Sequence, residues 1–246
     1  MKNIIIQGDC LEVMKGIPDK RIDMILCDLP YGTTACKWDT IIPFEPLWEQ
    51  YKRIIKDNGA IVLTASQPFT SALVMSNIEM FKYEWIWEKS KATGYLNSKK
   101  MPMLAHENVL VFSSGKIIYN PQMTKGKKYN KGKALRPTDV YGKQVAVLVK
   151  NDTGLRYPRT VKYFRTAESE GKLHPTQKPV ALFEYLIKTY TNEGDLVLDN
   201  CIGSGTTAIA CMKTNRNYIG IEKEQKYVDI ARNRVNTVKD LFTESI

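Results

Sequence analysis

Two short polar segments follow apolar stretches at opposite ends of the sequence. Residues 28–31 read Asp-Leu-Pro-Tyr, and residues 199–207 read Asp-Asn-Cys-Ile-Gly-Ser-Gly-Thr-Thr. A carboxylate next to a backbone carbonyl and an aromatic ring suits the binding of a planar amino group. A glycine-rich turn before a helix suits a nucleoside-bearing cofactor, because glycines let the backbone approach a ligand and the helix N-terminus offers free N–H groups. Together the segments indicate methyl transfer to the amine of a nucleobase.

The first segment matches the needs of a poor nucleophile. The exocyclic amine of adenine or cytosine has a lone pair delocalised into its ring, so a useful site accepts hydrogen bonds from both N–H groups. Asp28 offers a carboxylate and Leu29 a carbonyl for this purpose, Pro30 restricts the turn, and Tyr31 offers a ring on which a base can stack. The alternative is that these residues only end a strand.

The second segment admits more than one ligand. Glu222 lies 19 residues after Gly203, at the end of the next expected strand, where a carboxylate can hold the ribose hydroxyls. Asp199 is a suitable partner for the ammonium group of S-adenosylmethionine. The turn also satisfies the loose dinucleotide fingerprint, so a nicotinamide or flavin site and a purely structural turn stay open. Only 39 residues follow Thr207, which is short for a dinucleotide domain.

The elements that must position these segments alternate along the chain. Apolar, β-branched and aromatic runs predict strands, and 3.6-residue spacing predicts helices. This alternation predicts an α/β fold with a mostly parallel central sheet covered on both faces. We expect Asn58-Gly59 to stop the helix that precedes it. The expected strands are residues 3–7, 21–27, 60–64, 83–87, 108–112, 145–149, 196–198 and 218–221, and the expected helices are 46–56, 69–76, 180–191, 206–213 and one running through 235.

The charge is concentrated in one part of the chain. Of 36 Lys and Arg residues and 26 Asp and Glu residues, residues 113–172 hold 14 and 4 respectively, so the rest is neutral. A net charge of +10 indicates an anionic partner. Five cysteines without a C-x-x-C pair and two distant histidines predict no metal site. No apolar run is long enough for a membrane span. The sequence becomes polar directly after Ile6, too early for the apolar region of a signal peptide.

The motifs resemble those of a known family, the β-class amino-methylating DNA methyltransferases. These enzymes use D/N/S-P-P-Y for catalysis and D-x-F-x-G-x-G-T for cofactor binding, in the permuted order found here. Gly8-Asp9 resembles the motif that contacts the cofactor adenine, residues 174–179 resemble an H-x-T-x-K-P segment, and residues 106–110 resemble a late-strand motif. Leu29 and Cys201 depart from the family pattern, which has proline and commonly an aromatic residue there.

The resemblance implies a Rossmann-like methyltransferase fold with circularly permuted motifs, S-adenosylmethionine as cofactor and double-stranded DNA as substrate. Residues 1–112 would form the catalytic half, 113–172 a target-recognition insert and 173–246 the cofactor-binding half. The implied catalytic residues are Asp28, Leu29, Pro30 and Tyr31. The implied cofactor-binding residues are Asp9, Cys10, His174, Thr176, Gln177, Lys178, Asp199, Cys201, Gly203, Gly205, Thr206, Thr207 and Glu222.

The basic insert is the expected DNA-binding region. Flexible lysines suit phosphates, whereas arginines can form the bidentate contacts that read guanine. The alternative is that the insert is a solvated basic loop with no role in sequence recognition. The segment after the catalytic turn is expected to lie near the flipped base. The candidate DNA-binding residues are Lys37, Trp38, Lys125, Lys127, Lys128, Lys131, Lys133, Arg136, Arg156, Arg159 and Arg165.

The predicted reaction is N6-methylation of a flipped-out adenine within a specific site, because the family usually has Asp or Asn at the position of Asp28 for adenine and Ser for N4-cytosine. Alternatives are N4-cytosine methylation, methylation of RNA or a protein amide, a nicotinamide-dependent oxidoreductase, and a non-catalytic DNA-binding protein. C5-cytosine methylation is excluded, because no Pro-Cys pair occurs. A cytoplasmic location in a bacterial or phage-infected cell, a homodimer and a cognate restriction enzyme are further expectations.

Overall fold

The computed structural model describes residues 1–34, 36, 39–134, 142, 146–171 and 177–243. The described chain forms two compact units, one of Met1–Asn120 with Thr160–Ile246 and a smaller one of Pro121–Arg159. The larger unit contains an eight-stranded sheet in the order β1-β12-β11-β2-β3-β5-β4-β10. No helix among the described residues is long and apolar enough to cross a membrane.

The bounds of the elements agree with most of the expected ranges. The strands of the large sheet are β1 (Ile4–Gln7), β2 (Ile22–Asp28), β3 (Ile55–Ala65), β4 (Phe81–Thr93), β5 (Leu104–Phe112), β10 (Val161–Phe164), β11 (Leu196–Asp199) and β12 (Asn217–Glu222). The helices are α1 (Cys10–Lys15), α2 (Phe44–Ile54), α3 (Phe69–Ser76), α4 (Val180–Tyr190), α5 (Thr206–Lys213) and α6 (Gln225–Thr243), with 3-10 turns at Tyr95–Asn97 and Ala167–Glu170.

The sheet is mostly parallel, as predicted. All neighbouring strands in it run parallel except β5, which is antiparallel to both β3 and β4. Strand β11, near the C-terminus, pairs with β2 through Val197 opposite Met24. The two motif-bearing strands are therefore neighbours in space although they lie far apart in the sequence. This adjacency explains how a permuted motif order still builds one site.

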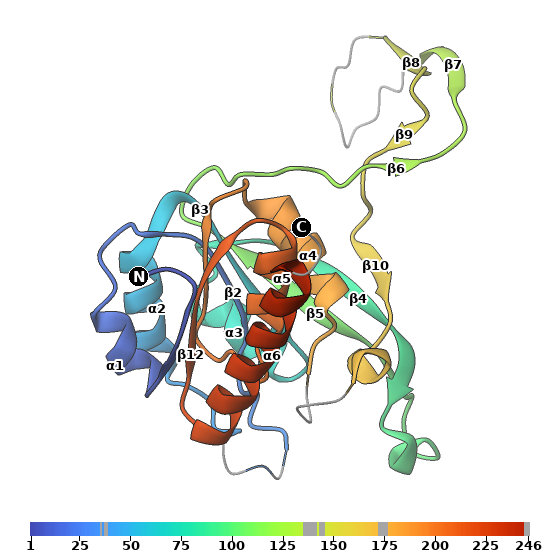
Figure 1. Cartoon of the computed structure of the whole chain (residues 1–246). Coiled ribbons are helices and arrows are strands. Elements are labelled where there is room, and N and C mark those ends of the chain that lie inside the picture. Colours follow the sequence, from blue (N-terminus) through green and yellow to red (C-terminus); the bar gives the residue numbers. More distant parts are fainter. Residues whose placement is uncertain (35, 37–38, 135–141, 143–145, 172–176, 244–246) are drawn as a thin grey trace. The chain divides into compact units, whose positions relative to one another are not determined.

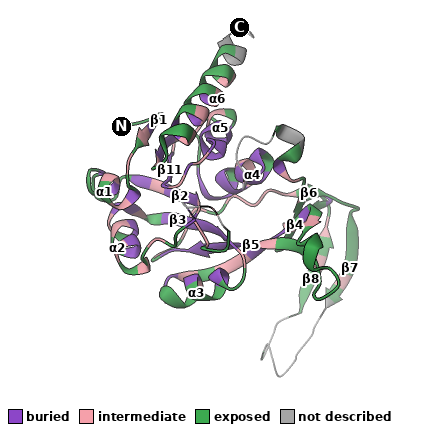
Figure 2. Cartoon of the chain, turned by 90° about the horizontal axis from the view of Figure 1, so that it is seen from below, coloured by how far each residue is buried: buried purple, intermediate pink, exposed green. Residues whose placement is uncertain are grey.

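Helices cover both faces of the sheet (Figure 1). One apolar cluster joins the sheet to α4, α5 and α6, through residues such as Phe183 and Val228. The other joins the opposite face to α1, α2 and α3, through residues such as Leu47 and Phe69. Figure 2 shows the resulting burial of the central strands. Two-sided burial explains the near-continuous apolar runs of these strands.

One expectation about the elements is wrong. Asn58-Gly59 does not stop α2, which ends at Ile54, but lies inside β3. The β2–β3 register shifts there, from Ile22 opposite Ile55 to Met24 opposite Ala60, so this turn-forming pair marks a bulge in a strand. The last helix continues past Val235 to Thr243.

The smaller unit consists of two short antiparallel ladders. Strand β6 (Thr124–Lys125) pairs with β9 (Leu155–Arg156), and β7 (Tyr129–Ala134) pairs with β8 (Val147–Asn151). Gly154 lies at φ +76, and a Cβ there would stand 2.5 Å from the Gly126 carbonyl oxygen. The described part of the basic stretch therefore contains two pairs of antiparallel strands.

Candidate active site

The larger unit has a cavity of about 740 Å³ at the carboxyl ends of its parallel strands. This is the edge where ligands bind in open α/β sheets, and the volume is typical of a small-molecule site. Most of the predicted catalytic and cofactor-binding residues line this one cavity. They are Asp9, Cys10, Asp28, Leu29, Pro30, Tyr31, Gln177, Lys178, Asp199, Cys201, Gly203, Thr206 and Glu222.

Other predicted residues lie elsewhere. Gly205 and Thr207 stand behind the cavity wall, where Thr207 donates a hydrogen bond to the Asp199 carboxylate. Lys125, Lys127, Lys128, Lys131, Lys133, Arg156 and Arg159 belong to the smaller unit, and Arg165 follows β10 in the larger one. Lys37, Trp38, Arg136, His174 and Thr176 lie outside the described residues.

The glycine-rich turn is held by the carboxylate at the end of the next strand. The Gly203 N–H donates to Glu222 Oε2 at 2.9 Å, and Gly203 has φ +51. Gly205 has φ +88, and a Cβ on it would meet the Ala231 Cβ of α6 at 3.1 Å. Both glycines therefore take left-handed conformations, and the second also permits close approach of a helix. The turn brings backbone and carboxylate groups to the cavity together.

Asp199 is a buried carboxylate at the end of β11. It is 3% exposed and accepts hydrogen bonds from the Thr207 hydroxyl and from the Cys201 N–H at 3.1 Å. Burial raises the pKa of Asp199 to about 7. A cation in the cavity would favour the ionised form of this group.

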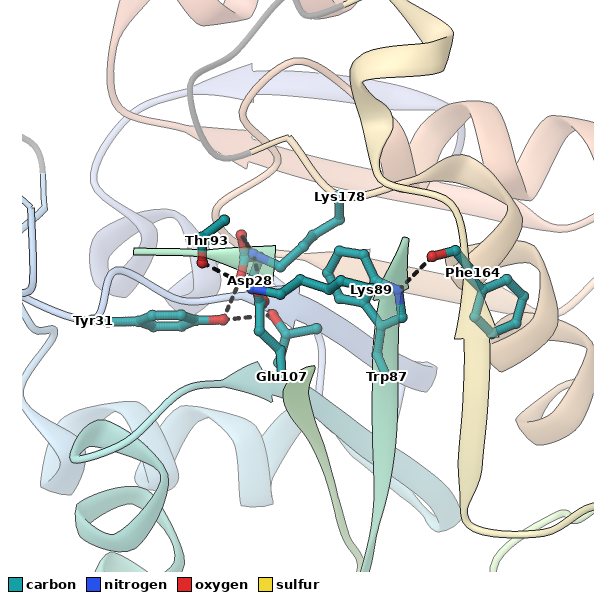
Figure 3. A network of polar contacts seen from close by, with 9 residues as sticks. Asp28, Tyr31, Trp87, Lys89, Thr93, Glu107, Phe164 and Lys178 are labelled. Atoms are coloured by element: carbon teal, nitrogen blue, oxygen red, sulfur yellow. Dashed lines mark hydrogen bonds and ion pairs between the residues drawn. The ribbon is translucent and has the colours of Figure 1, made fainter. Parts of the chain in front are cut away.

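Asp28 is surrounded by hydrogen-bond donors. Its Oδ1 accepts from the Tyr31 hydroxyl at 2.7 Å and from the Thr64 hydroxyl, and its Oδ2 lies 2.7 Å from Lys178 Nζ. Figure 3 shows Tyr31 and Lys178 converging on this carboxylate. Thr64 stands directly opposite Asp28 in the β2–β3 ladder. The carboxylate is therefore oriented from three elements at once.

The Tyr31 ring packs against an aromatic side chain of α3. Its ring stacks on Phe69, with centroids 5.1 Å apart and planes 24° from parallel. Burial, with the negative charge of Asp28, raises the pKa of the Tyr31 hydroxyl well above its usual value. The hydroxyl therefore stays protonated and donates to Asp28 at neutral pH.

A chain of charges that was not predicted from the sequence extends from Asp28. Lys178 Nζ lies 3.4 Å from Glu107 Oε2, and Lys89 Nζ lies 3.5 Å from Glu107 Oε1 (Figure 3). Lys178 and Lys89 are nearly fully buried. Burial opposes the charge of Lys178, but Asp28 and Glu107 outweigh it and raise the pKa of this lysine. Glu107 lies inside β5, opposite Trp87 of β4, and the only sequence signal for it is its place in the 106–110 motif.

A second missed residue holds the loop that follows the catalytic segment. Asp39 accepts hydrogen bonds from the backbone N–H groups of Gly32, Thr33 and Thr34 at 2.9, 3.0 and 2.7 Å. Burial alone would raise the pKa of Asp39, but the hydrogen bonds from these donors have the larger effect and lower it. A carboxylate seven residues after Gly32 thus fixes the backbone next to Tyr31.

The comparisons with known proteins agree with this geometry. Type II methyltransferase M.HinfI of Haemophilus influenzae is 29% identical, over 96% of this chain and 69% of that protein. M.HpaI of Haemophilus parainfluenzae is 26% identical, over 96% and 75%. The structure of the M1.HpyAVI–SAM complex superimposes with a TM-score of 0.64 at 27% identity, covering 94% of this chain and 98% of that chain. The cytosine-N4-specific PvuII DNA methyltransferase shares the fold, with a TM-score of 0.64 at 16% identity over 97% and 90%.

The family comparison covers most of the chain. The sequence profile of the DNA methylases that modify N6 or N4 matches residues 22–233. That range includes the Asp28 segment, the Asp199 turn and both sides of the cavity between them. The chain is therefore a member of the N6/N4 DNA methylase family.

Proposed function

We propose that this protein transfers a methyl group from S-adenosylmethionine to the N6 amine of an adenine flipped out of double-stranded DNA, within a specific site. The observation that supports this proposal most directly is the shared cavity of Asp28 and Asp199. An amine-binding carboxylate and a cofactor-binding turn that open into one space suit direct transfer between two bound molecules.

The residues of the glycine-rich turn fit the cofactor. A buried carboxylate with a pKa of about 7 suits an ammonium group. Glu222 lies at the end of β12 and keeps further lone pairs beyond its bond from Gly203, which suits ribose hydroxyls. Asp9, which caps α1 through the Leu11 N–H at 2.9 Å, is placed for the adenine end. When bound, S-adenosylmethionine supplies an electrophilic methyl group on a sulfonium.

The chain's own residues then prepare the amine. Asp28 accepts one N–H of the target amine and the Leu29 carbonyl accepts the other, which draws the nitrogen lone pair out of the ring. Tyr31, supported from behind by Phe69, presents a ring face to the base. Lys178 and Thr64 hold the Asp28 side chain in its orientation. In the transfer the amine nitrogen would bond to the methyl carbon as the sulfur–carbon bond breaks, the cofactor would leave as a neutral thioether, and the cationic nitrogen would give its extra proton to solvent water.

The same proposal assigns residues 1–112 and 173–246 to the catalytic and cofactor-binding halves and residues 113–172 to target recognition. The described lysines of the smaller unit are all exposed, which suits phosphate contacts. Arg156 is more constrained, because its guanidinium lies 4.8 Å from the Tyr129 ring centroid. Arg159 and Arg165 are exposed and suit base contacts better.

The finer expectations belong to the proposal as well. The M.HinfI and M.HpaI relatives are named Type II methyltransferases, which supports a bacterial cytoplasmic setting and a cognate restriction enzyme. We also propose a homodimer, which sedimentation of the purified chain would test.

The test of the reaction is transfer of labelled methyl from S-adenosylmethionine to unmethylated genomic DNA, followed by nucleoside digestion and mass spectrometry. N6-methyldeoxyadenosine is the expected product. N4-methyldeoxycytidine would retain the enzyme class and overturn the base assignment. Transfer to RNA or protein, with none to DNA, would overturn the substrate.

A further inference from the structure

The hairpin between β4 and β5 extends beyond the sheet. The last paired residues are Thr93 and Leu104, and residues 94–103 form an excursion that contains the 3-10 turn Tyr95–Asn97. Backbone hydrogen bonds order this segment, including Asn97 N–H to the Gly94 carbonyl at 2.9 Å. Figure 1 shows the segment projecting from the end of β4. The segment therefore has a defined backbone conformation of its own.

The tip of this hairpin is apolar and almost fully exposed. Leu96 is 97% exposed, Tyr95 is 76% exposed and Met101 is 52% exposed. None of these side chains belongs to either apolar core cluster. A group of large apolar side chains held in solvent by an ordered turn is typical of a surface that binds a partner.

The charge of the hairpin indicates the kind of partner. Residues 89–106 contain four lysines and no Asp or Glu. Lys99 and Lys100 are exposed beside the apolar tip. A second copy of this chain would bring another net charge of +10 to the contact, whereas nucleic acid brings phosphates. Proteins that kink DNA combine two kinds of residue. Lysines bind the phosphates of the backbone, and neighbouring apolar side chains insert between stacked bases.

The position of the hairpin connects it with the reaction. Lys89, Thr93 and Leu104, at its base, line the active-site cavity. A base that enters this cavity comes from a duplex lying across its mouth, next to the projecting tip. Flipping a base costs a few kcal/mol and leaves a gap in the stack. An apolar side chain that enters the stack there offsets part of that cost.

We propose that residues 94–103 form a second DNA-contacting element outside the basic insert. Leu96 and Tyr95 enter the base stack beside the flipped base, and Lys99 and Lys100 bind the flanking phosphates. This inference rests on the proposed function in taking duplex DNA as the substrate, and it deepens that function by assigning the wedge.

Photocrosslinking tests the contact directly. The full chain carries p-benzoylphenylalanine in place of Leu96, or in place of Met75 on α3, which is 70% exposed and serves as the control. Each protein is irradiated with duplex DNA of random sequence, and methyl transfer to genomic DNA is measured on the same preparation. We expect crosslinks to DNA from position 96 only.

Each outcome of the crosslinking is informative. Transfer without a DNA crosslink at position 96 overturns the wedge and retains the proposed function. A DNA crosslink at position 96 with no transfer by the Met75 control protein supports the contact and refutes the proposed function. Crosslinks between two protein chains at position 96 would assign the tip to a dimer interface and overturn the proposal.

Steady-state kinetics of Leu96 variants test whether this side chain contributes to the reaction on DNA. We expect Leu96→Ser to lower kcat/KM for DNA about tenfold, because it removes a stacking contact, with the Kd for S-adenosylmethionine unchanged. Leu96→Met keeps an apolar wedge and should retain most of the activity, and Met75→Ser should match the wild type. Wild-type kcat/KM in Leu96→Ser would refute the role. Leu96 makes no core contact, so the variant folds.

Discussion

The ammonium of Lys178 lies 2.7 Å from the carboxylate of Asp28, although 150 positions separate the two residues in the chain. This ion pair joins the segment before α4 to the end of β2. Both Lys178 and its second partner, Glu107, are largely buried, with side chains 7% and 17% exposed. The segment before α4 and the end of β2 are thus coupled through one cation.

Replacing Lys178 with methionine should destabilise the fold by about 3 kcal/mol, because two mostly buried carboxylates lose their nearest cation. The raised pKa of Lys178 sets the pH window. Its contribution is complete below the unfolded pKa of about 10.5 and is lost as pH rises through the folded pKa. Chemical denaturation at pH 8 and above pH 11 would measure this.

The matched control is Lys178→Arg, which retains the charge and should lose much less stability at pH 8. The difference between wild type and Lys178→Met should shrink at the higher pH. A difference that is the same at both pH values would contradict the ion pair as its source.

Asp28→Ala should lower the transfer rate about 100- to 1,000-fold, the usual effect of removing one hydrogen-bonding group from a transition state. Binding of S-adenosylmethionine, measured by calorimetry, should stay close to that of the wild type, because the proposed partner of Asp28 is the target amine. Asp28→Asn keeps one acceptor oxygen, so its transfer rate should lie between that of the wild type and that of Asp28→Ala. Loss of cofactor affinity with residual transfer would place Asp28 in the cofactor site.

The affinity for S-adenosylmethionine should depend on the ionisation of Asp199. Below its pKa of about 7 the carboxyl is protonated, and binding an ammonium then requires loss of that proton. We expect the affinity to fall about tenfold for each pH unit below 7. Calorimetry across pH 5.5–8 would measure the trend, and Asp199→Asn should bind weakly with no such dependence.

The same pKa has a signature in the ligand-free protein. Because it is raised from 3.8, the stability that Asp199 contributes is complete below pH 3.8 and is lost as pH rises through about 7. The Asp199→Asn variant lacks this loss. Parallel pH dependences of unfolding in the variant and the wild type would argue against the raised pKa.

Alanine in place of Lys125, Lys127 and Lys128 should weaken binding to every DNA sequence by a similar factor. Each lost phosphate contact should reduce the slope of log K against log salt by about 1. Arg159→Ala serves as the comparison, since loss of a base contact changes site preference. Altered preference in the lysine variant would refute the division between phosphate-binding lysines and base-reading arginines.

The strands that position the site could be predicted from their composition. Both segments that open the cavity follow buried apolar runs, so their place at strand ends could be inferred locally. Strand β10 was missed because Val161–Phe164 lies in a stretch rich in lysine and tyrosine, and its pairing with Ile86–Lys89 of β4 is a tertiary contact. The bulge at Asn58-Gly59 was mistaken for a helix end, because asparagine and glycine are favoured both at helix ends and at strand bulges.

The sequence by itself determined the chemistry at each motif: a carboxylate and an aromatic ring after β2, and glycines with a carboxylate after β11. Strand ends and positive-φ turns depend on local residue types, so they can be inferred from neighbours in the chain. Only the tertiary structure decided that Thr64 and Lys178 orient Asp28, and that Glu107 lies between two lysines. Sheet register and the reach of long side chains across the sheet edge set those contacts, and neither leaves a periodic signal in the sequence.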